Sequence, residues 1–125
     1  MLASSKLIAF LLTKDKLRAK IFYTDVLGLT FVRDDGFALV FDANGTMLRI
    51  AEMKDFTPQK GTTLGWEVGD LPGTIRELVS HGVQFERFGM PQDESGIWTA
   101  PGGDQVAWFK DPDGNLLSLS RHIAR

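Results

Sequence analysis

Cysteine is absent from this 125-residue chain, and histidine occurs only twice. Without cysteine the chain can form no disulfide bond, and it has no thiolate ligand for zinc or iron. The absence also fits a cytoplasmic location, which we expect for this protein. The first residues lack the basic and apolar regions of a signal peptide, so we expect no secretion signal.

Long apolar runs and a surplus of positive charge are missing as well. No segment approaches the ~20 apolar residues that a membrane-spanning helix needs. The 14 Lys and Arg residues are outnumbered by 16 Asp and Glu residues, which gives a formal net charge of -2. Binding to nucleic acid depends largely on clustered positive charge. We therefore expect no membrane span and no nucleic-acid partner, and we favour a small-molecule ligand or a protein partner.

Apolar residues are plentiful in comparison. Hydrophobic residues make up 43% of the chain and charged residues 24%, which is ordinary for a protein that buries a core. The length is close to the commonest size of one compact domain. We therefore predict that residues 1–125 form a single domain.

The chain contains an internal repeat. Residues 37–50 align with residues 106–119 at a constant offset of 69, which places Gly45 on Gly114. Both segments have the pattern of two apolar strands joined by an Asp/Asn/Gly turn, which predicts a β-hairpin.

Upstream of its hairpin, each repeat has a predicted strand and a predicted helix. The apolar stretches 7–13 and 63–68 are followed by Asp15 and Asp70, which are suitable N-caps for a helix. Each half is therefore expected to be a βαβββ unit, and the fold class to be α+β. The two predicted repeats span about residues 6–53 and 62–123.

The first helix is predicted from its apolar spacing. Leu17, Ile21 and Phe22 recur at helical spacing, and Gly28 is a suitable stop. Tyr23 follows directly, and we expect it to reach solvent or a dimer contact.

The second repeat is longer than the first. The offset rises from about 55 to 69 along the chain, so the second repeat carries roughly fourteen extra residues. They fall at about residues 88–103, a segment rich in glycine and proline that also contains Trp98. This segment is either a surface loop whose Trp packs into the core, or a lid over a ligand site.

Strand alternation separates a helix-facing side of the sheet from a mixed, concave side. An apolar concavity with a few polar groups is typical of a small-molecule site. The alternatives are that these side chains fill the space themselves or meet a partner subunit. The residues expected on this side are Ile8, Phe10, Arg49, Thr63, Glu67, Trp108 and Ser118.

Two motifs resemble the vicinal oxygen chelate superfamily. The first is the helix segment from Asp15 to Leu29, with Arg18, Phe22 and Gly28 at its characteristic positions, and the second is the terminal hairpin 109–116. This superfamily includes glyoxalase I, extradiol dioxygenases and bleomycin-binding proteins. The resemblance implies tandem βαβββ modules forming a cupped mixed sheet, often completed by a homodimer, and we expect a homodimer here.

The resemblance also implies where a metal would be held in catalytic members. The four ligand positions fall on Ile8, Arg49, Thr63 and Ser118. Divalent metals prefer imidazole and carboxylate donors, and none of these four side chains supplies one. We therefore predict no metal and no cofactor. The two histidines, His81 and His122, are expected to have capping or tail roles.

The function predicted from these observations is metal-free binding of an apolar or aromatic small molecule, as in the bleomycin-binding members. Trp98 and Trp108 would stack on the ligand, and Arg49 would either bind its carboxylate or phosphate or pair with Glu67 or a loop group. The alternative is a lyase, isomerase or dioxygenase-like enzyme that uses Glu67 as acid or base, or an unforeseen metal site. A dimeric interaction module is a third possibility. No nucleophile motif stands out, so covalent catalysis is not expected.

Overall fold

The computed structural model describes residues 1–123. The chain divides into two compact units, the first spanning Met1–Pro58 and the second beginning at Gln59, and each is described by itself. The first unit contains β1 (Ile8–Thr13), α1 (Lys16–Ile21), the π-helical turn η1 (Phe22–Val26), β2 (Thr30–Asp34), β3 (Leu39–Ala43) and β4 (Thr46–Glu52). The second contains β5 (Leu64–Glu67), α2 (Leu71–Ser80), β6 (Trp98–Thr99), β7 (Gln105–Lys110) and β8 (Leu116–Arg121).

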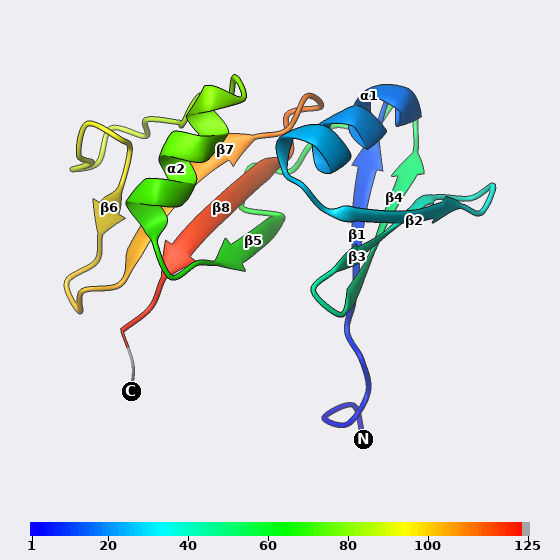
Figure 1. Ribbon diagram of the computed structural model, residues 1–125, viewed down its shortest axis with the longest axis horizontal. Helices are drawn as coiled ribbons and strands as arrows, with labels where there is room; N and C mark the ends of the chain where they lie inside the picture. Colours follow the sequence, from blue (N-terminus) through cyan, green and yellow to red (C-terminus); the bar gives the residue numbers. More distant parts are fainter. Residues whose placement is uncertain (124–125) are drawn as a thin grey trace. The chain divides into compact units, whose positions relative to one another are not determined.

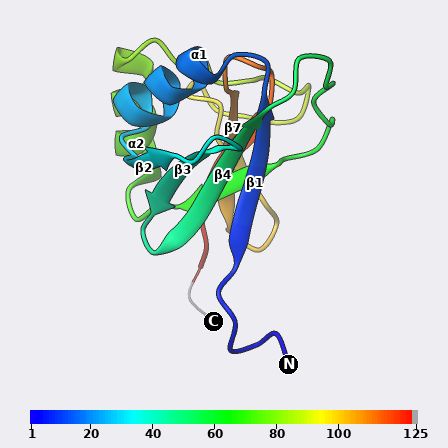
Figure 2. The same ribbon diagram turned by 90° about the vertical axis from the view of Figure 1, so that its right-hand side faces the viewer.

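Each unit has one mixed, four-stranded sheet. The strand orders are β1-β4-β3-β2 and β5-β8-β7-β6. The first strand of each unit runs parallel to the last, β1 beside β4 (Figure 2) and β5 beside β8, while the other neighbours are antiparallel. The predicted α+β class, with two βαβββ units, is therefore confirmed.

Both predicted helix caps are present. The Asp15 carboxylate accepts a hydrogen bond from the backbone N of Arg18 at 3.1 Å, and that of Asp70 accepts one from Gly73 at 3.0 Å. The Asp70 carboxylate lies close against Gly73, where there is no Cβ. α2 packs against β8 (Figure 1), and its buried residues are Leu71, Ile75 and Leu78.

The larger apolar residues of the first helix do not form its buried face. Leu17 and Ile21 are 69% and 52% exposed, whereas Ala19 and Tyr23 are each only 1% exposed. Residues 19 and 23 are one helical turn apart, so they form a competing stripe, and the small alanine allows a close approach to β4. Tyr23 packs against Phe41 with a ring-centroid separation of 6.1 Å, so it does not reach solvent.

The constant offset of 69 holds for the last strand of each unit but not for the strand before it. Val40 pairs with Arg49, nine residues away, whereas Trp108 pairs with Ser118, ten residues away. The second turn is therefore one residue longer. It is built around Asp111, which is 6% exposed and accepts a hydrogen bond from the backbone N of Asn115.

The additional residues of the second unit interrupt its edge strand. Phe85 forms a bridge to Phe109 in β7, and Trp98 pairs with Val106 further along the same strand. Between these two contacts the chain makes an excursion that returns beside β6, where Gln92 forms a bridge to Trp98. In the first unit the corresponding edge strand, β2, has only a register shift after Phe31. The insertion thus lies where the first unit has a small irregularity.

No helix within residues 1–123 has the length and apolar character required to cross a membrane.

Candidate functional site

The open face of the first sheet is the face turned away from α1. Ile8 and Phe10 lie on this face in β1, and they are 44% and 65% exposed. Arg49 in β4 is the register partner of Phe10. Their neighbours Leu11 and Leu48 alternate to the buried side. The structure therefore brings together the three predicted site residues of the first unit.

A loop carboxylate holds the Arg49 guanidinium. Arg49 Nη2 donates a hydrogen bond to Asp35 Oδ2 at 2.8 Å, and both side chains are 24% exposed. Asp35 Oδ1 also accepts hydrogen bonds from the backbone N–H groups of Phe37 and Ala38. The Arg49 hydrogen bond, followed by these two backbone hydrogen bonds, lowers the pKa of Asp35 from 3.8 to about 2. Arg49 is therefore paired with Asp35, a loop group, which was one of the partners predicted for it.

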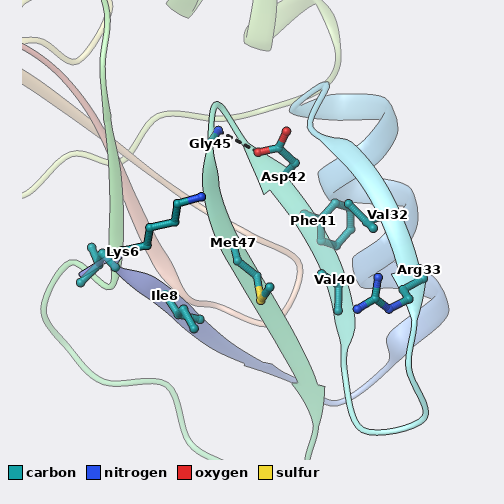
Figure 3. Close-up of a pocket in the computed structure, with 10 residues that line it drawn as sticks. Lys6, Ile8, Val32, Arg33, Val40, Phe41, Asp42, Gly45 and Met47 are labelled. Carbon is teal, nitrogen blue, oxygen red and sulfur yellow. Dashed lines mark hydrogen bonds between the residues drawn. The ribbon is translucent and has the colours of Figure 1, made fainter. Parts of the chain in front are cut away.

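A pocket of about 310 Å³ opens on the first unit (Figure 3). Ile8, Val40 and Met47 supply apolar walls, and Lys6 and Arg33 reach toward it from opposite sides. Within residues 1–123, neither cation has a hydrogen bond or an ion pair. Such a pocket can hold an apolar body beside an anionic group. Neither Lys6 nor Arg33 could be predicted as a pocket residue, because scattered basic residues are also ordinary on a solvated surface.

An aromatic cluster occupies the open face of the second sheet. The Trp108 ring lies 5.5 Å from Phe88 and 6.3 Å from Trp98, measured between ring centroids. Trp108 in β7 is the register partner of Ser118 in β8, and Ser118 is in turn the register partner of Gly65 in β5. Trp98 is half-buried in β6, so it is neither a core residue nor fully exposed. Of the predicted site residues in the second unit, Trp98, Trp108 and Ser118 therefore lie together.

Glu67 and Thr63 occupy different surroundings. Glu67 is exposed in β5 and is the register partner of Ser120. Thr63 precedes that strand, and its backbone N donates to the carbonyl of Leu116 at 2.8 Å. The Thr63 hydroxyl is buried, and it has no hydrogen-bond partner among the described residues. A buried hydroxyl without a hydrogen-bond partner is costly.

The four metal-ligand positions inferred from the resemblance do not fit a divalent cation. Ile8 carries no donor atom, and Arg49 is a fixed cation bound to Asp35. Thr63 and Ser118 offer only neutral hydroxyl groups, whereas such metals are held mainly by imidazole and carboxylate groups. Among residues 1–123, no group of three or more His, Asp or Glu side chains is placed to hold a metal ion.

The sequence pattern of the Glyoxalase/Bleomycin resistance protein/Dioxygenase superfamily matches residues 7–119. The chain belongs to this superfamily. The match covers both βαβββ units and includes the open-face residues described above. A comparison with curated protein sequences found no match.

Solved structures of the glyoxalase superfamily share the fold. Lactoylglutathione lyase from Agrobacterium tumefaciens has a TM-score of 0.73 at 18% identity, covering 94% of this chain and 93% of that one. A superfamily member from Sphaerobacter thermophilus has a TM-score of 0.73 at 22% identity, covering 98% and 100%. A glyoxalase family protein from Enterococcus faecalis has a TM-score of 0.72 at 18% identity, covering 96% and 99%. At these identities the likeness extends to the fold alone.

Proposed function

We propose that this glyoxalase-superfamily protein binds a small apolar or aromatic molecule without a metal ion. The observation that carries the proposal is the cluster of Phe88, Trp98 and Trp108 on the open face of the second sheet. Phe88 and Trp98 both belong to the inserted segment of about residues 88–103, so the insertion supplies the two rings that lie beside Trp108. A ligand would lie between Trp108 and this segment, with Ser118 as a polar contact.

Aromatic side chains suit this role because they offer large apolar area with little conformational freedom to lose. Stacking on one ring typically contributes about 0.5–1.5 kcal/mol beyond area burial. Thr63 and Glu67 would supply further polar contacts in the second unit.

In the first unit, we propose that Ile8, Phe10 and Arg49 contact a ligand. Arg49 donates one N–H to Asp35, and a guanidinium has five N–H donors in a planar fork. A carboxylate on the ligand could therefore bind Arg49 without displacing Asp35. The donor chemistry at Ile8, Arg49, Thr63 and Ser118 supports binding that does not require a metal.

The test is a titration with 1-naphthoate, an aromatic carboxylate, followed by tryptophan fluorescence with and without EDTA. We expect saturable quenching that EDTA does not change. Trp108→Leu should weaken binding roughly 2- to 10-fold, the equivalent of one lost stacking contact. Trp66→Phe is the matched control, because Trp66 alternates to the other side of β5 from Glu67. Loss of binding on chelation, or equal binding in Trp108→Leu, would argue against the proposal.

We also propose that the protein is a cytoplasmic homodimer. Apolar side chains on β1 and α1 support a dimer, since Phe10 and Leu17 are 65% and 69% exposed. The absence of cysteine supports the location. Light scattering measures the solution mass, and a monomeric mass at micromolar concentration would rule out the dimer.

A further inference from the structure

Three polar side chains near the end of β8 form a chain of hydrogen bonds that the binding proposal does not use. Asp104 Oδ2 lies 3.0 Å from His122 Nδ1, and His122 Nε2 lies 2.9 Å from Ser120 Oγ. The His122 side chain is 42% exposed and that of Asp104 is 19% exposed, so the group is open to a small substrate.

The chemistry of the three groups fixes the direction of these hydrogen bonds. An ionised carboxylate only accepts hydrogen bonds, so in the neutral imidazole the proton is on Nδ1 and is donated to Asp104. Nε2 then carries a lone pair and accepts a hydrogen bond from the Ser120 hydroxyl. A serine hydrogen-bonded to a histidine that is oriented by a carboxylate is the arrangement that activates a serine nucleophile.

The backbone on both sides of the group is held in place. The Ser120 carbonyl accepts a hydrogen bond from the backbone N of Val68 at 2.8 Å, within a strand paired on both edges. Asp104 closes a turn in which its carbonyl accepts from Ala100 N at 2.8 Å, and its Oδ1 accepts from Ile123 N at 2.8 Å. Gly103 suits this turn, because its φ of +100° favours glycine.

We propose that Ser120, His122 and Asp104 form an acyl-transfer site that hydrolyses small neutral esters. Ser120 pairs with Val106, which pairs with Trp98, so an aromatic leaving group can lie against that ring. The preference for aromatic esters rests on the proposed binding surface, whereas the acyl transfer does not. Glu67 is the other register neighbour of Ser120, and its carboxylate disfavours an anionic substrate.

The reaction has two balanced steps. Ser120 Oγ attacks the ester carbonyl carbon while its proton passes to His122 Nε2, and the ester C–O bond then breaks as His122 returns that proton to the leaving phenol. Water next attacks the acyl-serine and gives its proton to His122. The bond to Oγ breaks, the proton returns to Ser120, and the carboxylic acid leaves. Asp104 is a positioning residue that keeps the imidazole in the required tautomer.

The test uses p-nitrophenyl acetate with the intact chain. We expect a burst of about one p-nitrophenolate per chain, and peptide mass mapping of the quenched protein should place the acetyl group on Ser120. S120A should abolish the burst, and H122N should slow it by roughly 10²- to 10⁴-fold. The matched controls S80A and H81N should retain it, because both residues are exposed and lie outside the group.

The role of Asp104 is tested by a measurement that a purely structural role would leave unchanged, namely the tautomer of the His122 imidazole. In D104N the side-chain amide can donate to Nδ1, which moves the imidazole proton to Nε2 and removes the base. Nitrogen NMR of the labelled imidazole should report this tautomer change together with loss of the burst.

The peptide mass map uses the chain without substitutions, so it tests the role of Ser120 even if a variant fails to fold. Acetyl groups on lysines or His81 but not on Ser120 would overturn the proposal, as would an unchanged burst in S120A. Binding of 1-naphthoate is measured separately. A missing burst with intact naphthoate quenching refutes the acyl-transfer site alone, and the reverse result refutes the binding surface alone.

Discussion

The two βαβββ units share one scaffold on the side of the sheet that faces the helix. Phe41 in the first unit and Phe109 in the second are both fully buried. Each packs against an aromatic residue of the edge strand, with ring centroids 5.5 Å apart for Phe31–Phe41 and 5.3 Å apart for Phe85–Phe109. The repeat is therefore preserved where the sheet and the helix build the core.

The open faces of the same two sheets differ at equivalent positions. In the first unit the register row is Phe10, Arg49 and Val40, and in the second it is Gly65, Ser118 and Trp108. The first row centres on a cation held by Asp35, whereas the second centres on an aromatic ring. A duplicated core thus carries two different surfaces, and the functional chemistry lies in the part that the repeat does not conserve.

The largest effect is expected from the shared core. Phe41→Ala and Phe109→Ala should each lower the free energy of unfolding by about 3–5 kcal/mol, because each removes a fully buried aromatic ring. Chemical denaturation followed by circular dichroism measures both. If one substitution costs less than about 1 kcal/mol, the two positions are not equivalent and the comparison fails.

The two hairpin turns provide a smaller contrast. Asp111→Ala should cost about 1–3 kcal/mol, because it leaves the backbone N and the side-chain amide of buried Asn115 without their acceptor. Asp42→Ala should cost less than about 1 kcal/mol, because Asp42 is exposed and its hydrogen bond to Gly45 N can be replaced by water. Equal losses in denaturation experiments would show that the longer second turn adds no stability.

The features that the sequence predicted correctly are those with local causes. The Asp15 and Asp70 caps and both hairpins depend on residues within a few positions of one another, so their signals are complete in the sequence. The inner face of α1 was not predictable in the same way. Two stripes compete on that helix, and close packing against β4 favours the one with Ala19.

Side-chain pairing across loops was the least predictable part of the candidate site. Arg49 could have met either of two adjacent aspartates, and the turn that directs Asp35 toward it is visible only in the structure. Ser120 and His122 are two residues apart at the end of a strand, so strand alternation could have placed them on one side. Asp104 is eighteen residues from His122, and only the fold reveals that contact.

The smallest expected effect concerns acid stability, and it belongs to the first unit, since Ser118 takes the place of Arg49 in the second. The pKa of Asp35 is lowered from 3.8 to about 2 in the folded chain, first by Arg49 and then by two backbone hydrogen bonds. A lowered pKa stabilises the fold above the unfolded value of 3.8, and this contribution disappears as the pH falls toward 2.

Asp35→Asn should therefore differ most from the unaltered chain near neutral pH, and the difference should shrink between about pH 4 and pH 2. Lys16 likewise lowers the pKa of Asp34, and this pair is unchanged in Asp35→Asn. The variant should therefore keep part of the acid dependence of stability. Arg49→Met removes the largest cause of the Asp35 shift and should flatten the same part of the curve. Denaturation midpoints measured across this pH range provide the test. A constant difference between Asp35→Asn and the unaltered chain would mean that the Arg49–Asp35 pair contributes nothing to the acid dependence.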